Sequence, residues 1–177
     1  MKAFKLLFIS TLVLILNSCD DLDKYTKFDL GFTQEVTIKA STSVNLPFNL
    51  PTPPVSTNSE SAFKTNNTNK DLVEEINLTK LQLKVLSPAG EDFSILKSIE
   101  VSISAAGLPT EKVAWLDAVP TGQSTILLDV SSTDLKDYIF ADEFTLNVNT
   151  VTDEMNTRDY QIEIKSVFNV NAKLLGI

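Results

Sequence analysis

Several short stretches of this chain alternate apolar and polar residues with a period of two, and this pattern limits the fold more than any other feature. A strand with one face on a core and one face in water needs that alternation. The stretch 32–38 keeps it except at Gln34, which is polar at an apolar position. The other stretches are 81–86, 99–104, 126–130, 144–148, 160–164 and 168–172. The sequence therefore predicts an all-β fold of antiparallel strands.

Turn residues divide these stretches into short, regularly spaced strands. Ser87-Pro88-Ala89-Gly90, Gly107-Leu108-Pro109 and Pro120-Thr121-Gly122 stand between them, and Gly and Pro at such places mark turns. Region 77–173 is close in length to one immunoglobulin domain of about 100 residues. We therefore expect an antiparallel β-sandwich with immunoglobulin-like connectivity.

Two segments predict short helices. In 132–139, Ser or Thr supplies an N-cap and Leu135 and Ile139 are four residues apart, which places them on one helix face. Segment 69–76 carries Asp71 and Glu74 near its start. We expect one or two short helical turns between strands. A parallel α/β sheet would need strands that alternate with long helices, and that pattern is missing from the sequence.

The first residues have the composition of a signal peptide. Lys2 and Lys5 precede a run at 6–16 that is apolar except for Ser10 and Thr11. A helix that spans a bilayer needs about 20 apolar residues, so the run is too short for a mature span. It ends at Cys19 without the small-residue cleavage site of an ordinary secretory signal. We expect residues 1–18 to be a signal peptide.

The end of this run, Leu16-Asn17-Ser18-Cys19, resembles the lipobox of bacterial lipoproteins. Asn17 stands where the family usually has a small or aliphatic residue. The resemblance implies cleavage before Cys19, acyl chains on its thiol and the membrane as partner. Each buried methylene contributes about 0.8 kcal/mol, so two or three chains make a stable anchor. An uncleaved anchor, or an ordinary signal followed by an isolated cysteine, is the alternative.

Asp20, Asp21 and Asp23 follow directly and resemble the surface-export signal of lipoproteins from the Bacteroidota. This resemblance implies an outer-membrane lipoprotein exposed at the cell surface. The alternative is an anchor that faces the periplasm, in which the acidic residues only keep the tether solvated. Residues 19–27 are then a lipidated acidic tether.

The rest of the chain divides at residue 77 by composition. Region 28–76 holds one strand, followed by a stretch rich in Pro, Asn, Ser and Thr at 41–68. Apolar residues such as Phe48, Leu50 and Phe63 recur in this stretch, and a free linker would gain nothing from them. We expect 28–76 to pack on a sandwich body formed by 77–177.

The composition excludes several functions. The chain has no histidine and one cysteine, which removes histidine-based triads, histidine-ligated zinc and an internal disulfide. Its formal net charge is −8, so nucleic acid is not an expected partner.

The remaining candidates for chemistry are unspecific. The pairs Glu91 and Asp92, Asp134 and Asp137, Asp142 and Glu143, and Asp153 and Glu154 could in principle serve a glycosidase. Segment 129–134 has oxygen donors for calcium but lacks a calcium-loop motif. Ser94 and Lys97 have the spacing of a serine–lysine pair without its companion motifs. We expect no catalytic residue, no metal and no cofactor.

Trp115 is the sole tryptophan, and Val113 and Leu116 beside it predict a core position rather than an exposed sugar platform. We expect a non-catalytic, membrane-anchored lipoprotein that binds or scaffolds an envelope protein or glycan. A surface glycan-binding module is the alternative, and a hydrolase that uses two carboxylates is less expected.

Overall fold

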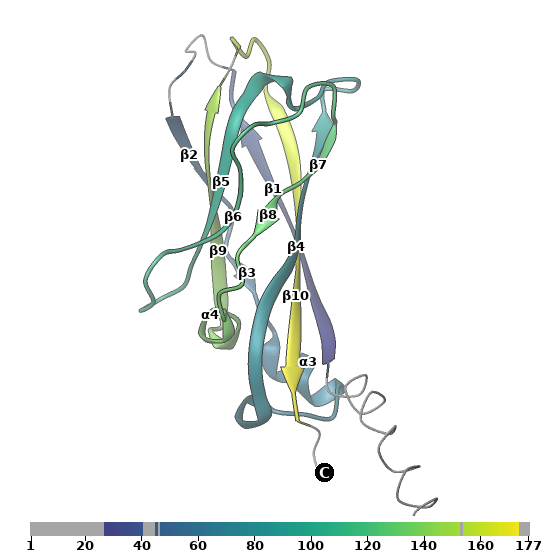
Figure 1. Ribbon diagram of the computed structural model, residues 1–177, viewed down its shortest axis with the longest axis vertical. Coiled ribbons are helices and arrows are strands. Elements are labelled where there is room, and N and C mark those ends of the chain that lie inside the picture. The colour runs from purple at the N-terminus through teal and green to yellow at the C-terminus, as the bar shows by residue number, and fades with distance from the viewer. Residues whose placement is uncertain (1–26, 41–44, 46, 153, 174–177) are drawn as a thin grey trace, which may run out of the picture.

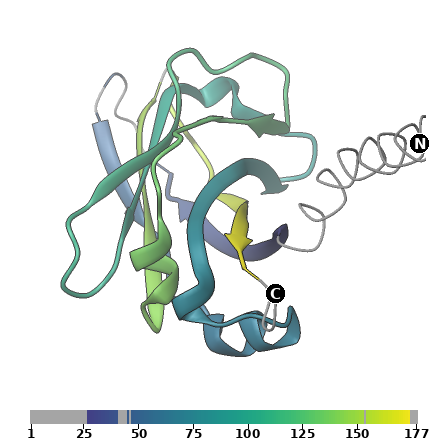
Figure 2. The ribbon, with the colours of Figure 1, turned by 60° about the horizontal axis from the view of Figure 1, so that its bottom comes forward.

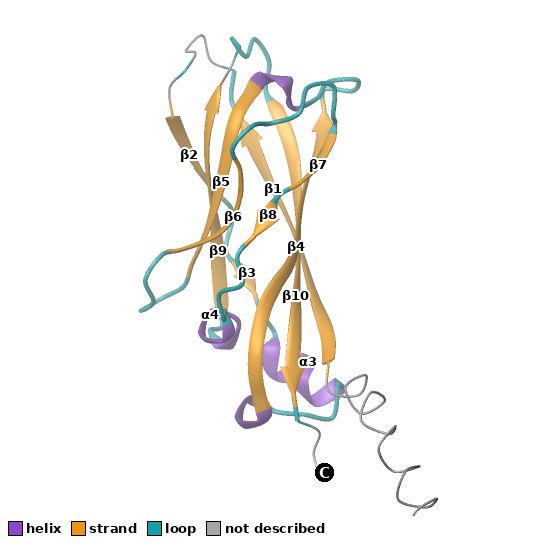
Figure 3. Cartoon of the chain, in the orientation of Figure 1, coloured by secondary structure: helices purple, strands orange, loops and turns teal. Residues whose placement is uncertain are grey.

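The protein is an antiparallel sandwich of two sheets (Figures 1 and 3). The computed structural model describes residues 27–40, 45, 47–152 and 154–173. The first sheet has the order β1 (Lys27–Ile38), β10 (Tyr160–Ala172), β4 (Val73–Ser87) and β7 (Thr125–Leu127). The second has the order β2 (Pro47–Pro51), β9 (Glu143–Thr152), β5 (Leu96–Ser104), β6 (Glu111–Leu116) and β8 (Asp129–Val130), with β3 (Val55–Ser56) also paired to β9. The all-β antiparallel sandwich predicted from the sequence is confirmed.

The strand pairings are nested along the chain. The first strand, β1, pairs with the last, β10, and β2 and β3 pair with the strand before it, β9. Inside these pairs, β4 pairs with β7 and β5 with β6. Nested pairs split between two sheets are the connectivity of a jelly roll. In an immunoglobulin sandwich the first and last strands lie in different sheets, so this connectivity differs from the immunoglobulin-like one that the sequence predicts.

The expected boundary at residue 77 does not separate a body from an attached segment. β4 begins at Val73 and runs through that boundary. β1 pairs with β10 over twelve residues without a register shift, and β2 forms an edge of the second sheet. Region 28–76 is therefore part of the sandwich rather than a layer packed on it.

The short helices lie between strands. α4 (Lys136–Phe140) overlaps the predicted segment 132–139. Segment 69–76 forms only the 3-10 turn η1 (Lys70–Leu72), because β4 takes the chain from Val73 onward. A second 3-10 turn, η2 (Phe93–Ile95), precedes β5. α3 (Ser59–Thr65) lies in the polar stretch where no helix was expected. The two stretches expected at 160–164 and 168–172 form the single strand β10.

Three phenylalanines join the two sheets in the core. Phe144 of β9 meets Phe32 of β1 with ring centroids 5.1 Å apart, and Phe168 of β10 at 5.8 Å. All three contacts of this trio have edge-to-face geometry, which aromatic rings favour. Gln34, two residues after Phe32, also points inward and is 6% exposed.

One end of the sandwich is closed by α3 and α4 (Figure 2). Phe63 of α3 contacts Phe28 at the start of β1 and Phe140 at the end of α4. Lys173, at the end of the described chain, donates its backbone N–H to the carbonyl of Leu72 at 2.9 Å. The beginning of β1 and the end of β10 therefore lie at the same end of the molecule, which we call the α3 end.

Candidate functional site

Trp115 lies half-buried on the outer face of the second sheet, which corrects its predicted place in the core. The register of β5 with β6 shifts between Val101 and Ser102, so Val113 is an extra residue without an opposite partner. Such a bulge breaks the strict alternation of faces along a strand. Val113 and Ala114 are both fully buried, and Trp115 turns outward.

Trp115 belongs to a row of side chains that crosses the second sheet from edge to edge. Asn49 of β2 is opposite Asn149 of β9, which is opposite Glu100 of β5. Glu100 is in turn opposite Trp115 of β6, and Trp115 is opposite Asp129 of β8. Directly opposed residues of antiparallel strands point to the same face. We call these five residues the Trp115 row.

A shallow hollow of about 230 Å³ lies over the middle of this row. Its polar lining includes Ser98, Glu100, Asn149 and Asp117, and its apolar lining consists of Trp115, Pro47, Ile99 and Val151. The hollow therefore combines one aromatic face with carboxylate, amide and hydroxyl groups. Small-molecule sites in proteins also place polar groups beside an apolar surface to orient the ligand, although most of their lining is apolar, whereas most of the residues that line this hollow are polar.

Lys112 lies over the Trp115 ring and is held there by Glu100. The Lys112 Nζ is 5.2 Å from the centroid of the ring and 2.8 Å from Glu100 Oε2. Both charged side chains are close to half exposed, so the ion pair contributes at most about 1 kcal/mol to stability. Lys112 can therefore move away from the indole ring at a small cost in free energy.

The outer face of the first sheet has a different composition. Lys165 and Glu163 of β10 form an ion pair at 3.0 Å, and Gln161 donates to Glu35 of β1 at 2.7 Å. These are interleaved charges of both signs on exposed or partly exposed positions, which is typical of a solvated surface. The two faces of the sandwich are therefore chemically unequal.

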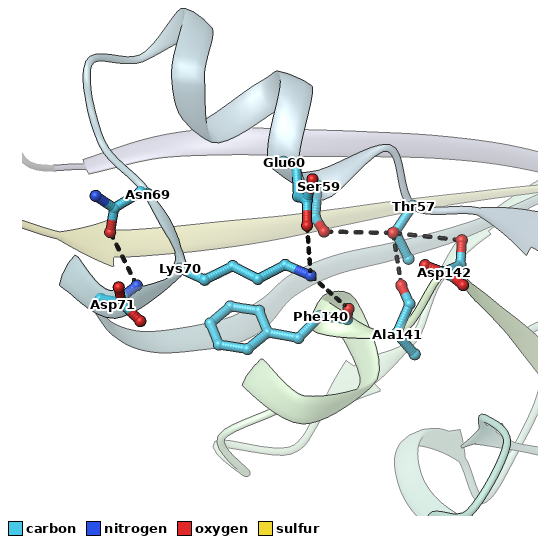
Figure 4. Close-up of polar contacts among 9 residues, drawn as sticks. All are labelled: Thr57, Ser59, Glu60, Asn69, Lys70, Asp71, Phe140, Ala141 and Asp142. Carbon is cyan, nitrogen blue, oxygen red and sulfur yellow. Dashed lines mark hydrogen bonds and ion pairs between the residues drawn. The ribbon is translucent and has the colours of Figure 1, made fainter.

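A second hollow, of about 450 Å³, is lined by residues 56–61 at the start of α3, by Lys70 and by Asp142, and Figure 4 shows the polar contacts in this region. Lys70 donates from Nζ to the carbonyl of Phe140 at 3.0 Å and lies 3.5 Å from Glu60. Thr57, which is buried, donates from Oγ1 to the carbonyl of Ala141 at 2.7 Å. Lys70 and Thr57 thus hold the segment around α3 against the end of α4, and their role is structural.

Three of the acidic residues considered for catalysis, Glu91, Asp92 and Asp134, have structural partners. Asp92 Oδ1 accepts the backbone N–H of Ser94 at 2.7 Å, and hydrogen bonds from Ser94 hold the pKa of Asp92 below its usual value. Asp134 accepts the N–H groups of Ile76 and Lys136, both at 3.0 Å. Glu91 accepts the hydroxyl of Tyr160 at 2.8 Å. Of the other expected pairs, Asp153 lies outside the described residues.

The hydroxyl groups considered as calcium ligands or as a serine nucleophile also form hydrogen bonds within the protein. Ser131 and Thr133 are hydrogen-bonded to each other at 2.7 Å. Ser94 accepts the backbone N–H of Gly122 at 3.1 Å. Within the part of the chain that the structure describes, no cluster of three or more Asp, Glu, Cys or His residues is arranged to hold a metal.

The lipidation residue Cys19 and the acidic residues Asp20, Asp21 and Asp23 lie outside the described residues, as does the expected signal peptide. Among the helices of the described chain, none has the length and apolar character needed to cross a bilayer.

No protein-family model matches the sequence, and a search of curated proteins finds no match. Among solved structures, the chain is similar to the capsid of Helicobacter pylori bacteriophage KHP30, with 9% identity, a TM-score of 0.33, and 81% of this chain and 92% of that chain covered. It is also similar to tomato aspermy virus, with 13% identity, a TM-score of 0.32, and coverage of 85% and 80%. These similarities are too low to indicate a function.

Proposed function

We propose that the protein is a non-catalytic, lipid-anchored binding protein of the cell envelope, and that its binding surface is the Trp115 row with the adjacent hollow. The observation that carries this proposal is the half-exposed Trp115 on an otherwise polar sheet face. A large aromatic side chain on such a face favours contact with a ligand, since aromatic residues are enriched at binding surfaces.

The anchor in this proposal is Cys19, on the strength of the lipobox resemblance. Eight residues from Cys19 to Lys27 reach at most about 28 Å when extended. Because β1 begins at the α3 end, this end would face the membrane. The sheet faces would then stand away from the bilayer, with the Trp115 row accessible from the side. An outer-membrane position at the cell surface follows from the resemblance of Asp20, Asp21 and Asp23 to an export signal.

The anchor and the export signal are tested separately. Cys19→Ala is expected to leave an unprocessed precursor that incorporates no labelled fatty acid. Replacement of Asp20, Asp21 and Asp23 by alanine is expected to keep the lipid label but to protect the protein from protease added to intact cells. Unchanged protease sensitivity of this triple variant would remove the export role from the acidic residues. Protection of the unaltered protein would favour the periplasm-facing alternative.

The binding surface is tested by photo-crosslinking of the lipidated protein in its native cells. A photoreactive residue replaces Asn149 in the Trp115 row, or Thr33 on the exposed face of β1 as the matched control. We expect a specific adduct from position 149 and none from position 33. Adducts from position 33 alone, or from neither position, would contradict the proposed binding surface.

A further inference from the structure

We infer that the ligand of this surface is a neutral glycan chain that lies across the strands along the Trp115 row, with one sugar ring on the Trp115 indole. The inference rests on the proposed function and adds the chemical class and direction of the ligand. Neighbouring strands are about 4.8 Å apart. A row over the five strands from β2 to β8 is therefore about 19 Å long, which suits an extended oligomer better than a single small molecule.

The groups of the row match the chemistry of a sugar. A sugar ring has apolar C–H faces and a rim of hydroxyl groups that both donate and accept hydrogen bonds. The indole of Trp115 offers an apolar surface for the ring face. Among the described residues, the side chains of Asn49 and Asn149 have no hydrogen-bond partner, so each amide can donate to and accept from a hydroxyl. Glu100 adds an acceptor beside the ring.

The charges on this face favour a neutral ligand. Lys112 is neutralised by Glu100 at 2.8 Å. Asp117 beside the hollow and Asp129 at the end of the row add negative charge, and both repel an anion. A uronic acid or a phosphorylated glycan would lose more by this repulsion than it gains from a lysine that is already paired.

A protein partner fits the same face less well. The buried centre of a protein interface is depleted in Ser and charged residues relative to other surface. Here the neighbours of the row on β5 and β9 are Ser98, Ser102, Asn147 and Val151, of which only Val151 is apolar. Capture of a protein at this surface would therefore contradict a glycan ligand.

Lys112 determines specificity in this arrangement. Its ammonium lies 5.2 Å from the indole centroid, in the position where a sugar ring would stack. A neutral glycan must displace it and lose a cation–π contact of about 0.5–1 kcal/mol. Removal of the charge is therefore expected to tighten the binding of a neutral glycan by about two- to fivefold, whereas it would weaken the binding of an anionic one.

The fluorescence of Trp115 reports the test directly, because it is the only tryptophan of the chain. The full lipidated protein in detergent is titrated with neutral oligosaccharides (cello-, malto-, manno- and laminari-oligomers of two to six sugars), with oligogalacturonate, and with polysaccharide released from the native envelope. We expect a saturable change in emission with at least one neutral glycan and none with oligogalacturonate. Hexamers are expected to bind more tightly than dimers.

Variants test whether the change in fluorescence comes from binding at the Trp115 row, and the affinity of each variant is measured by calorimetry. Trp115→Ala is expected to weaken binding at least tenfold and Trp115→Phe less, whereas Lys112→Met tightens it. Asn49→Ala should weaken binding of hexamers but not of dimers. Thr145→Ala lies on the same face but further along β9. It tests whether the glycan runs across the strands and not along β9, and it should leave the affinity unchanged. Circular dichroism checks that each variant is folded.

The outcomes separate this inference from the proposed function. No saturable binding of any neutral glycan, or weaker binding after Lys112→Met, overturns the neutral glycan. If a protein adduct still forms at position 149, the binding surface stands and its ligand is a protein. If neither glycan nor adduct is found, both proposals fail.

Discussion

Tyr160 has the largest pKa shift among the ionisable groups of the described residues. Burial, followed by the hydrogen bond to Glu91 and the charge of Glu91, raises the pKa of Tyr160 to about 12. In the unfolded chain a tyrosine has a pKa near 10. Between these values the unfolded state binds fewer protons than the folded state, so the free energy of unfolding falls as the pH rises from about 10 to 12.

This dependence is measurable by urea unfolding at pH 9 to 12. Tyr160→Phe is expected to have a shallower loss of stability over that range than the unaltered protein. Glu91→Gln is expected to lower the pKa of Tyr160, followed by phenolate absorbance, because it removes the neighbouring negative charge. Identical stability curves for the protein and Tyr160→Phe would show that Tyr160 does not carry the effect.

Gln34 is the second residue with a testable energetic role. Neither Nε2 nor Oε1 of this buried side chain has a hydrogen-bond partner. A buried polar group without a partner costs about 1–3 kcal/mol. Gln34→Met, which keeps a similar shape, is expected to raise the free energy of unfolding by about 1 kcal/mol. The exposed Gln161→Met is the control, and a loss of stability in Gln34→Met would contradict the prediction.

At the scale of elements, the sandwich depends on contacts between β9 of the second sheet and β1 and β10 of the first. Phe144 supplies these contacts and is 1% exposed. Phe144→Ala is expected to lower the free energy of unfolding by about 3–5 kcal/mol, measured by urea denaturation. Phe140→Ala, at a partly buried position on α4, should cost less. Equal losses of unfolding free energy in the two variants would contradict this prediction, because the α3 end would then contribute as much to stability as the core.

The bulge in β6 explains why the sequence pattern predicts Trp115 in the core, whereas the structure places it on the outer face. Strict alternation from Val113 puts Trp115 on the inner face. The bulge at Val113 depends on the pairing of β6 with β5, and β6 carries no sign of it because no glycine or proline marks the position. A polar interruption such as Gln34, by contrast, leaves β1 in register because backbone hydrogen bonds and the residues around it hold the strand.

At the scale of the whole molecule, nested pairing makes the chain one cooperative unit. A chain that begins at residue 77 lacks β1, which is one of the two partners of β10, lacks β2 and β3, which pair with β9, and lacks part of β4. We expect residues 77–177 alone to show no cooperative thermal unfolding by circular dichroism, whereas residues 27–177 unfold cooperatively. A folded 77–177 fragment would restore the boundary predicted from composition.

The sequence by itself determined the class of fold and most of the strands. Alternation is a local property, so the strands of the sandwich other than β2 and β3, and the helical segment that overlaps 132–139, follow from neighbouring residues alone. The resemblance of the residues around Cys19 to a lipobox is likewise local and remains a prediction.

Only the tertiary structure decided the connectivity and the candidate site. Strand order depends on contacts between residues far apart in sequence, such as Lys27 with Asn171, and alternation carries no information about partners. The Trp115 row comes from five strands, and its members share a face only because of their register and one bulge. Local pattern can therefore predict a half-buried strand, but the pairing of strands decides which side chains meet on its outer face.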